Sequence, residues 1–399
     1  MSDRRSITRV TLCAIPLTPI HIGDGDAIRL DEYFIEKPTE ADDDSFSDDD
    51  DCSDESAARS DGPAMLCRFD QTRALREMGD ARRGVFRTYL DQGRLDEASK
   101  LLRDAGRRTV VERIALSEGS RRELQKAMAP SSARGGMVRM FIRSGGRPFV
   151  PGSSIKGAFR TALASARLPV GTRPDGLSHK QAMCDALGID SNDTATDPLR
   201  FLSVSDAMLP EGATRIDRAQ IIKRGGAPAN TRGRGGIQMH YERLRARSDG
   251  AEDRTKFAFT LGIDSRLGLS RADLFQTVTC YHWSVWRKER ELFFAEQPKT
   301  CTAMDRILRT GKTADGRSFD VAGPFARNFI LLRLGRFGHF ESKSLARVRQ
   351  GHFPQAKSPA DRVRRPDAWG STRTVTRNDA DAPIPFGWVL ACVEKEETL

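Results

Sequence analysis

Alternating apolar and polar residues predict the strands of this chain. The segments with this pattern are 7–17, 33–35, 64–70, 137–142, 201–207, 329–334 and 385–390. Apolar residues at helical spacing predict helices over 71–128, from Ile155 through Leu163, and over about 270–297. Two further segments, 237–242 and 256–263, look like strands that pair with each other. We therefore expect a chain that mixes helices with sheet.

The stretch FVPGSSIKGAFR at 149–160 combines a strand end, a Pro-Gly turn and the start of a helix. Ser153 or Ser154 can cap that helix by accepting hydrogen bonds from its first backbone N–H groups. These N–H groups and the positive end of the helix dipole attract phosphate. Lys156 and Arg160 are four residues apart and share one helix face. The same pattern also fits an ordinary capped helix with solvated cations, and spacing alone does not separate the two.

The charge of the chain is unevenly distributed. Residues 40–61 contain eleven acidic residues and one arginine, a local charge of −10, whereas the whole chain of 399 residues carries +10. The remainder holds 64 basic and 44 acidic residues, or +20. A body this basic favours a polyanionic partner, most often nucleic acid, and arginine suits bidentate phosphate contacts. A source with arginine-rich composition would give the same charge, so charge alone does not identify RNA.

The acidic segment 39–62 is rich in Asp and Ser and nearly free of aliphatic residues. Such a composition cannot bury enough surface to fold, so we predict a disordered loop. A solubilising insertion is the simpler interpretation. The alternative is that the segment mimics nucleic acid and screens a basic groove until RNA arrives.

Two later segments, 223–236 and 335–344, combine glycine with basic residues. The first is too rich in glycine to belong to a core, and mobile Gly/Arg loops commonly close over nucleic acid, although many are only flexible. The basic residues of interest in these loops are Lys223, Arg224, Arg232, Arg234, Arg336 and Lys343.

Several kinds of chemistry lack their motifs. The seven cysteines are scattered without a CxxC pair, which argues against a zinc finger and a disulfide framework. Gly311-Lys312-Thr313 resembles the end of a phosphate-binding P-loop, but Arg306 stands where the earlier glycine is needed. We expect no cofactor and no metal. His21 and Asp31 leave acid–base or metal-assisted cleavage of RNA as an alternative.

The apolar runs are too short for a membrane span, which needs about 18 residues or more. The first residues show no apolar signal-peptide core. We therefore expect a cytoplasmic protein with no membrane partner.

Two linked motifs resemble a known family. LTPIHIG at 17–23 and PGSSIKG at 151–157 resemble the RAMP proteins of type III CRISPR effector complexes. Weaker similarities occur at 203–207, at 216–218 and at Glu242. The loop 333–344, the long helical insertion and the closing Pro-Phe-Gly-Trp are most similar to the Csm-complex (type III-A) subunit that caps the backbone at the crRNA 3′ end.

The resemblance implies an α+β fold of two ferredoxin-like (RRM-like) RAMP domains. We place the N-terminal domain at 1–250, with a disordered acidic insertion at 39–62 and a helical insertion at 71–130, and the C-terminal domain at 251–399. The resemblance also implies that the chain binds crRNA through its phosphates. The implied partners are target RNA and the repeating RAMP backbone subunit and small subunit of the Csm complex, with host ribonucleases as further candidates.

The resemblance and the basic loops together suggest which residues contact RNA. They are His21, Gly23, Ser153, Ser154, Lys156, Arg160, Arg218, Lys223, Arg224, Arg232, Arg234, Arg336 and Lys343. The segment 223–236 falls where relatives have a thumb-like hairpin that enters the guide–target duplex. Phe337 and His339 stand where the family loop carries more glycine, which argues against close approach of RNA to that backbone.

Asp31 lies near the position of the target-cleaving aspartate of the backbone relatives, but the capping subunit is regarded as non-catalytic. The favoured interpretation is therefore a non-catalytic, crRNA-binding capping subunit that supports crRNA maturation and antiviral defence. The enzymatic alternative is a RAMP-fold endoribonuclease that uses His21 or Asp31. A generic RNA-binding protein fits the charge but not the linked motifs.

Overall fold

The computed structural model describes most of the chain. The described residues are 6–36, 63–129, 136–169, 171–172, 178–190, 193–226, 239–249, 255–297, 311–312, 318–319, 328–349, 369–378 and 381–399. The acidic segment 39–62 lies outside them, as do Arg232 and Arg234, so the predictions for these residues stay predictions.

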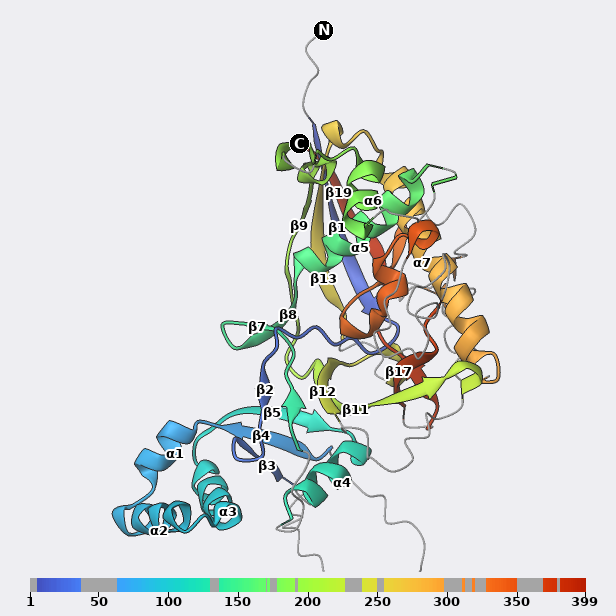
Figure 1. Ribbon diagram of the computed structural model, residues 1–399. Coiled ribbons are helices and arrows are strands. Elements are labelled where there is room, and N and C mark those ends of the chain that lie inside the picture. Colours follow the sequence, from blue (N-terminus) through green and yellow to red (C-terminus); the bar gives the residue numbers. More distant parts are fainter. Residues whose placement is uncertain are drawn as a thin grey trace, which may run out of the picture.

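The chain combines helices with strands (Figure 1), which confirms the predicted α+β class. The helices are α1 (Gln71–Glu77), α2 (Asp80–Asp91), α3 (Leu95–Gly106), α4 (Glu118–Ala127), α5 (Gly152–Arg167), α6 (His179–Leu187) and α7 (Arg271–Glu289), which continues as the π-helical turn η6 (Arg290–Phe294). Among the described residues, no helix has the length and apolar character that crossing a membrane requires.

A five-stranded antiparallel sheet forms the upper part of the molecule in Figure 1. Its strands, in spatial order, are β16 (Phe329–Arg333), β19 (Trp388–Thr398), β1 (Ile7–Pro16), β13 (Phe257–Asp264) and β9 (Leu202–Val204). Along the chain, α5 lies between β1 and β9, and α7 lies between β13 and β16. The strands β1, β9, β13 and β16 with these two helices therefore follow the order β-α-β-β-α-β, which is the order of a ferredoxin-like unit.

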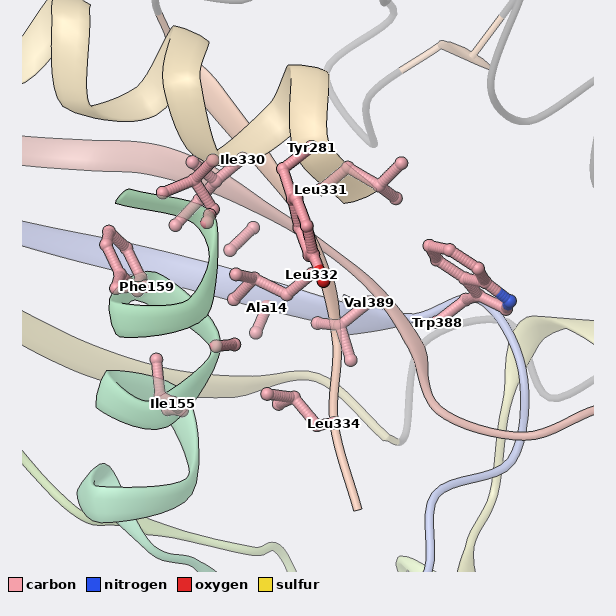
Figure 2. Packing of buried hydrophobic residues seen from close by; sticks show 14 of the residues in the cluster. Ala14, Ile155, Phe159, Tyr281, Ile330, Leu331, Leu332, Leu334, Trp388 and Val389 are labelled. Atoms are coloured by element: carbon pink, nitrogen blue, oxygen red, sulfur yellow. The ribbon is translucent and has the colours of Figure 1, made fainter. Parts of the chain in front are cut away.

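Both connecting helices cover the same face of this sheet. Val10, Leu12 and Ala14 alternate along β1 and are fully buried on that face. Ile155 and Phe159 of α5 lie in the same apolar cluster, as Figure 2 shows. The main core is therefore the layer between the five-stranded sheet and the helix pair α5–α7.

A second sheet, of nine strands with both parallel and antiparallel pairs, forms the lower part of the molecule (Figure 1). Its main path runs through β2 (Ala27–Ile28), β6 (Val138–Arg139), β12 (Met239–Leu244), β11 (Thr214–Lys223), β5 (Val110–Leu116), β4 (Met65–Phe69) and β3 (Tyr33–Glu36). The strand β17 (Thr372–Arg377) pairs with β11, and β18 (Pro383–Pro385) pairs with β17.

Two short sheets complete the described strands. One is three-stranded and joins β10 (Ala207–Met208), β8 (Arg147–Val150) and β7 (Arg143–Ser144). The β7–β8 hairpin projects from the side of the molecule between the upper and lower parts (Figure 1). The other is the pair β14 (Gly311–Lys312) and β15 (Ser318–Phe319).

Three sequence predictions about these elements are wrong. The helical pattern over 71–128 is interrupted by β5, which lies between α3 and α4 and pairs with β4 and β11. The strands near 237–242 and 256–263 do not pair with each other, because β12 pairs with β11 and β13 pairs with β1. The closing strand is not short, since β19 has 11 residues.

The five-stranded sheet crosses the predicted boundary at residues 250 and 251. It takes β1 and β9 from the first range and β13, β16 and β19 from the second. Residues 1–250 therefore hold only part of the five-stranded sheet, and the domain division stays a prediction.

A cluster of buried charges links α7 to the strands β16 and β17. The Oε1 atom of Glu289 lies 2.8 Å from Nη1 of Arg333 and accepts a 2.8 Å hydrogen bond from Nε of Arg373. Its Oε2 atom accepts a hydrogen bond of 3.3 Å from the indole N–H of Trp388. All four side chains are buried. We call Glu289, Arg333, Arg373 and Glu341 the buried charge cluster.

Glu341 brings the loop after β16 into this cluster. Its Oε1 lies 3.1 Å from Nη2 of Arg373 and accepts a 2.7 Å hydrogen bond from the backbone N–H of Gly370. The Tyr281 hydroxyl of α7 donates to the carbonyls of Glu341 and Ser344, at 3.1 and 3.0 Å. Two carboxylates thus compensate two guanidinium groups, and the loop is held against α7.

His339 is fixed in the same loop. Its φ of +54° is unusual for a residue with a side chain. Its Nε2 atom accepts a hydrogen bond of 3.1 Å from the backbone N–H of Thr374 and is therefore unprotonated. Burial, together with the charges of Arg333 and Arg373, lowers the pKa of His339 to about 2.

Replacing Glu289 with Gln tests the buried charge cluster. The change leaves two buried arginines with one carboxylate, and we expect the free energy of unfolding to fall by about 3–5 kcal/mol in urea titrations. Glu291→Gln is the matched control, because this exposed side chain pairs with Lys288 alone among the described residues and its loss should cost less than about 1 kcal/mol. Equal losses in the two variants would contradict the assigned role.

His339 predicts a dependence of stability on pH. The folded protein keeps this ring neutral, whereas the unfolded chain binds a proton below a pKa of about 6.5, so stability falls as the pH drops from 7 to 5. In the variant His339→Gly, glycine suits the positive φ and cannot bind this proton. We therefore expect its free energy of unfolding to fall between pH 7 and pH 5 by up to about 2 kcal/mol less than that of the wild type. Urea unfolding at both pH values measures the difference, and identical losses would exclude the linkage.

Candidate nucleic-acid interface

Chain segments from distant parts of the sequence meet at one end of the five-stranded sheet. The backbone N–H of Arg336 donates to the carbonyl of His21 at 2.8 Å. The N–H of Gly387 donates to the carbonyl of Pro19 at 2.7 Å, and the N–H of Leu334 donates to the carbonyl of Gly387 at 2.8 Å. The motif at 17–23, the loop 335–344 and the closing Pro-Phe-Gly-Trp therefore form one surface.

Gly335 allows two of these segments to come this close. Its φ is +86°, and a Cβ atom at this position would lie 2.5 Å from the carbonyl oxygen of His21. Any side chain would therefore push the loop away from the motif at 17–23. The short 3-10 turns η8 (Arg336–Gly338) and η9 (Phe340–Lys343) follow directly, and η9 contacts α5.

The start of α5 differs from the prediction. The N-cap residue is Pro151, and Ser153 and Ser154 lie inside the first turn, so the predicted serine cap is wrong. The backbone N–H of Gly152 donates instead to Oδ1 of Asp206 at 2.7 Å. A carboxylate that follows β9 thus occupies one of the helix-terminal donors, while the Ser153 side chain stays exposed.

The two cations predicted near the start of α5, Lys156 and Arg160, have different surroundings. Arg160 forms an ion pair with Asp197, which partly neutralises it. Lys156 is half-buried and has no hydrogen bond or ion pair with any residue in the described part of the chain. The helical spacing is as predicted, but only Lys156 keeps its full charge for an external anion.

Two more uncompensated cations come from the loop 335–344. The side chains of Arg336 and Lys343 are exposed, and neither forms an ion pair with the residues that the structure describes. Desolvation and the nearby charges of Arg333 and Arg336 lower the pKa of Lys343. Mutual repulsion of this kind favours the binding of an anion that compensates it.

His21 supports this surface from within. The side chain is only 2% exposed, and its Nδ1 lies 2.7 Å from the backbone carbonyl of Glu242, to which it donates. Burial lowers the pKa of His21, so the ring is neutral at pH 7. Its ring packs edge-on against Tyr241, with centroids 4.9 Å apart. His21 thus anchors the loop and presents no side-chain surface to RNA, whereas Gly23 is exposed.

Phe337 and His339 also turn toward the protein. The Phe337 ring packs against Tyr241 and Phe386, with centroid distances of 4.8 Å in both cases. His339 has the backbone conformation of a glycine and points its ring at Thr374. The two departures from the family pattern therefore do not project their side chains outward between the backbone and an approaching RNA.

The remaining predicted RNA contacts are scattered. Arg218 pairs with Glu123, and Arg224 donates to the carbonyl of Trp369 at 2.8 Å. Lys223 is exposed at the end of β11. These residues lie on and just after β11, in the second sheet.

Arg139 on β6 is a cation that the sequence patterns missed. Together with Arg336 it lowers the pKa of His21, which places both guanidinium groups near that ring. Its Nη1 donates to the carbonyl of Gly25 at 3.0 Å. In the sequence, the one hint of this cation was an arginine inside the apolar strand predicted at 137–142. That Arg139 lies near His21 could not be predicted, because the two residues meet only in the tertiary fold.

Asp31 is far from a catalytic arrangement in this structure. The carboxylate accepts a hydrogen bond of 3.2 Å from the side-chain amide of Gln71. Among the described residues, no three His, Cys, Asp or Glu side chains come together in a way that could hold a metal ion. In the part of the chain that the structure describes, Gln71 is the side chain hydrogen-bonded to this carboxylate, and an amide does not act as an acid–base group.

Solved structures with a fold similar to that of this chain include subunits of CRISPR complexes. The chain is similar to a chain of a "Csm-crRNA-target RNA ternary complex in type III-A CRISPR-Cas system", with a TM-score of 0.57, 14% identity and coverage of 97% of this chain and 100% of the other. It is also similar to Csm5 of T. onnurineus, with a TM-score of 0.49, 14% identity and coverage of 94% and 99%. No match was found among curated proteins.

The sequence itself matches a family model. The match is to the RAMP superfamily and spans residues 15–269, which is more than half of the chain and includes both motifs that carried the resemblance. The chain belongs to the RAMP superfamily.

Proposed function

We propose that this protein is a crRNA-binding, backbone-capping subunit of a type III-A CRISPR effector complex. It holds the RNA backbone near the crRNA 3′ end and supports crRNA maturation and antiviral defence. The observation that carries the proposal is three cations without ion pairs to the described residues, Lys156, Arg336 and Lys343. Arg336 and Lys343 belong to the loop that bonds to the first family motif at His21 and contacts α5, the helix of the second motif, which carries Lys156.

The binding mechanism follows from the chemistry of these groups. Ammonium and guanidinium groups attract phosphate without reading base identity, and the positive end of the α5 helix dipole adds to this attraction. The fold similarity to a chain of a Csm complex with crRNA and target RNA supports this choice of ligand. The proposed protein partners are the repeating RAMP backbone subunit and the small subunit, with host ribonucleases as further candidates.

A second candidate function is a RAMP-fold endoribonuclease that processes CRISPR RNA or cleaves target RNA. It rests on His21 and Asp31. The buried, neutral His21 and the isolated Asp31 make this the weaker candidate.

The salt dependence of RNA binding tests the phosphate contacts. In the double variant Lys156→Ala, Arg336→Ala, two contacts are lost, and the slope of log affinity against log salt should shrink by about 1.4. Arg160 is left unchanged, because it forms an ion pair with Asp197 and its replacement would disturb the fold.

The matched control for this experiment is Lys100→Ala, Arg87→Ala. Both residues are exposed on the helical insertion, and their loss removes the same charge. We expect fluorescence titrations with single-stranded RNA to give the wild-type slope for the control. A wild-type slope in the Lys156, Arg336 variant would contradict the proposed phosphate contacts.

An Asp31→Ala variant separates the two candidate functions. We expect neither the wild type nor the variant to cleave repeat-containing or target RNA, with or without Mg²⁺, when products are resolved on denaturing gels. Cleavage by the wild type that disappears in the variant would support the endoribonuclease and overturn the non-catalytic proposal.

A further inference from the structure

The small sheet β10-β8-β7 carries a row of apolar side chains across its three strands. Met208 of β10 lies opposite Phe149 of β8. On the other side of β8, the backbone N–H of Phe149 donates to the carbonyl of Ile142 at 3.3 Å, which places Ile142 opposite Phe149 as well. Directly opposed residues of antiparallel strands point to the same face, so these three side chains are neighbours.

Phe149 and Met208 of this row lie on the outer face of the small sheet, whereas Ile142 also packs against the main core. Val150 and Ala207, the next pair along the strands, point to the opposite face and are buried, at 0% and 1% exposure. Met208 is 42% exposed, and Phe149 is partly exposed. An accessible aromatic ring beside an accessible methionine on a sheet is unlike a core pattern and resembles the surfaces on which proteins stack nucleic-acid bases.

The opposite face of the hairpin is held firmly. Arg143 forms two hydrogen bonds with the carboxylate of Glu242, of 2.7 and 2.8 Å, and Glu242 is completely buried. Glu242 also accepts a hydrogen bond of 2.8 Å from the backbone N–H of Phe141. The outer row is therefore displayed on a rigid support, which lowers the entropy lost when a ligand binds.

The charge on the outer face is positive. Arg147 precedes Phe149 by two residues on β8 and so points to the same face. It is exposed and forms no ion pair with the described residues. Arginine next to an aromatic ring suits single-stranded RNA, because it can contact the phosphate or stack on a neighbouring base.

The outer face is continuous with the start of α5. The chain passes from Phe149 through Val150 and Pro151 directly into the helix that carries Ser153 and Lys156. An RNA strand whose phosphate lies at the start of α5 thus has its adjacent bases within reach of β8.

We propose that the outer face formed by Phe149 and Met208, flanked by Arg147, stacks bases of single-stranded RNA whose phosphates lie at the start of α5. The assignment rests on the proposed function and adds to it a base-contacting surface. Stacking of this kind tolerates any base sequence, since every base has an aromatic face.

A Phe149→Ala variant of the full chain tests this assignment. Fluorescence titrations with a single-stranded RNA should show about tenfold weaker binding, with the salt slope unchanged because no phosphate contact is lost. Phe149→Trp should restore binding, because the aromatic face is kept. Val111→Ala, which removes a more exposed apolar side chain on β5, should have no effect.

Photocrosslinking with 5-iodouridine-substituted RNA provides an independent readout that does not depend on mutant stability. We expect crosslinked peptides to contain Phe149. Unchanged affinity in Phe149→Ala, or crosslinks at α5 without any at Phe149, would overturn the base-stacking surface and leave the proposed function intact. Loss of subunit assembly without loss of RNA affinity would instead assign this face to a protein partner and overturn the proposal.

Failure of the proposed function gives a different result from failure of the base-stacking surface. The wild type would then bind RNA without a contribution from Lys156 and Arg336, and their double variant would keep the wild-type salt slope.

Discussion

Glu289 and the two arginines that surround it hold the candidate RNA-binding surface in place. Arg333 comes from β16 and Arg373 from β17, and both meet Glu289 on α7 inside the protein. Glu341 then ties the loop after β16 to the same group. Buried charges are costly unless each has its counterpart, so this cluster tolerates few alternative arrangements of the loop. The position of the exposed side chains of Arg336 and Lys343 on the protein surface therefore depends on the buried charge cluster beneath the loop.

The surface itself distinguishes compensated from uncompensated cations. Arg160 and Arg218 each have a carboxylate partner within the protein, whereas Lys156, Arg336 and Lys343 have none among the described residues. Only the latter group gains a new ion pair from a phosphate without losing an old one. The positive charge of the chain is therefore a poor guide to the interface, and the pairing of individual side chains is a better one.

Sequence patterns predicted much of the fold because it follows local rules. The alternation in β1, the apolar spacing of α5 and α7 and the Pro-Gly turn before α5 all carried over to the structure. Two kinds of feature did not. The strand β5 was hidden among helices because its seven residues pair only with distant strands. The length of β19 was hidden because its charged end pairs with β1.

The candidate site shows the same division between local and tertiary information. Lys156 could be found from the helix-start pattern, but the pairing of Arg160 with Asp197 and the capping of Gly152 by Asp206 join residues that are distant in sequence. The burial of His21 against Glu242 likewise depends on a contact across 221 residues. The motifs therefore identified the region, while tertiary contacts decided which side chains face outward.

Hydrogen–deuterium exchange of the full chain, with and without single-stranded RNA, tests the central claim most directly. Three segments should gain protection together when RNA binds: 20–23 and 335–344 at the end of the five-stranded sheet, and 152–156 at the start of α5. The helical insertion α1–α3 should exchange at the same rate with and without RNA. Protection confined to the helical insertion, with none at these three segments, would contradict the account.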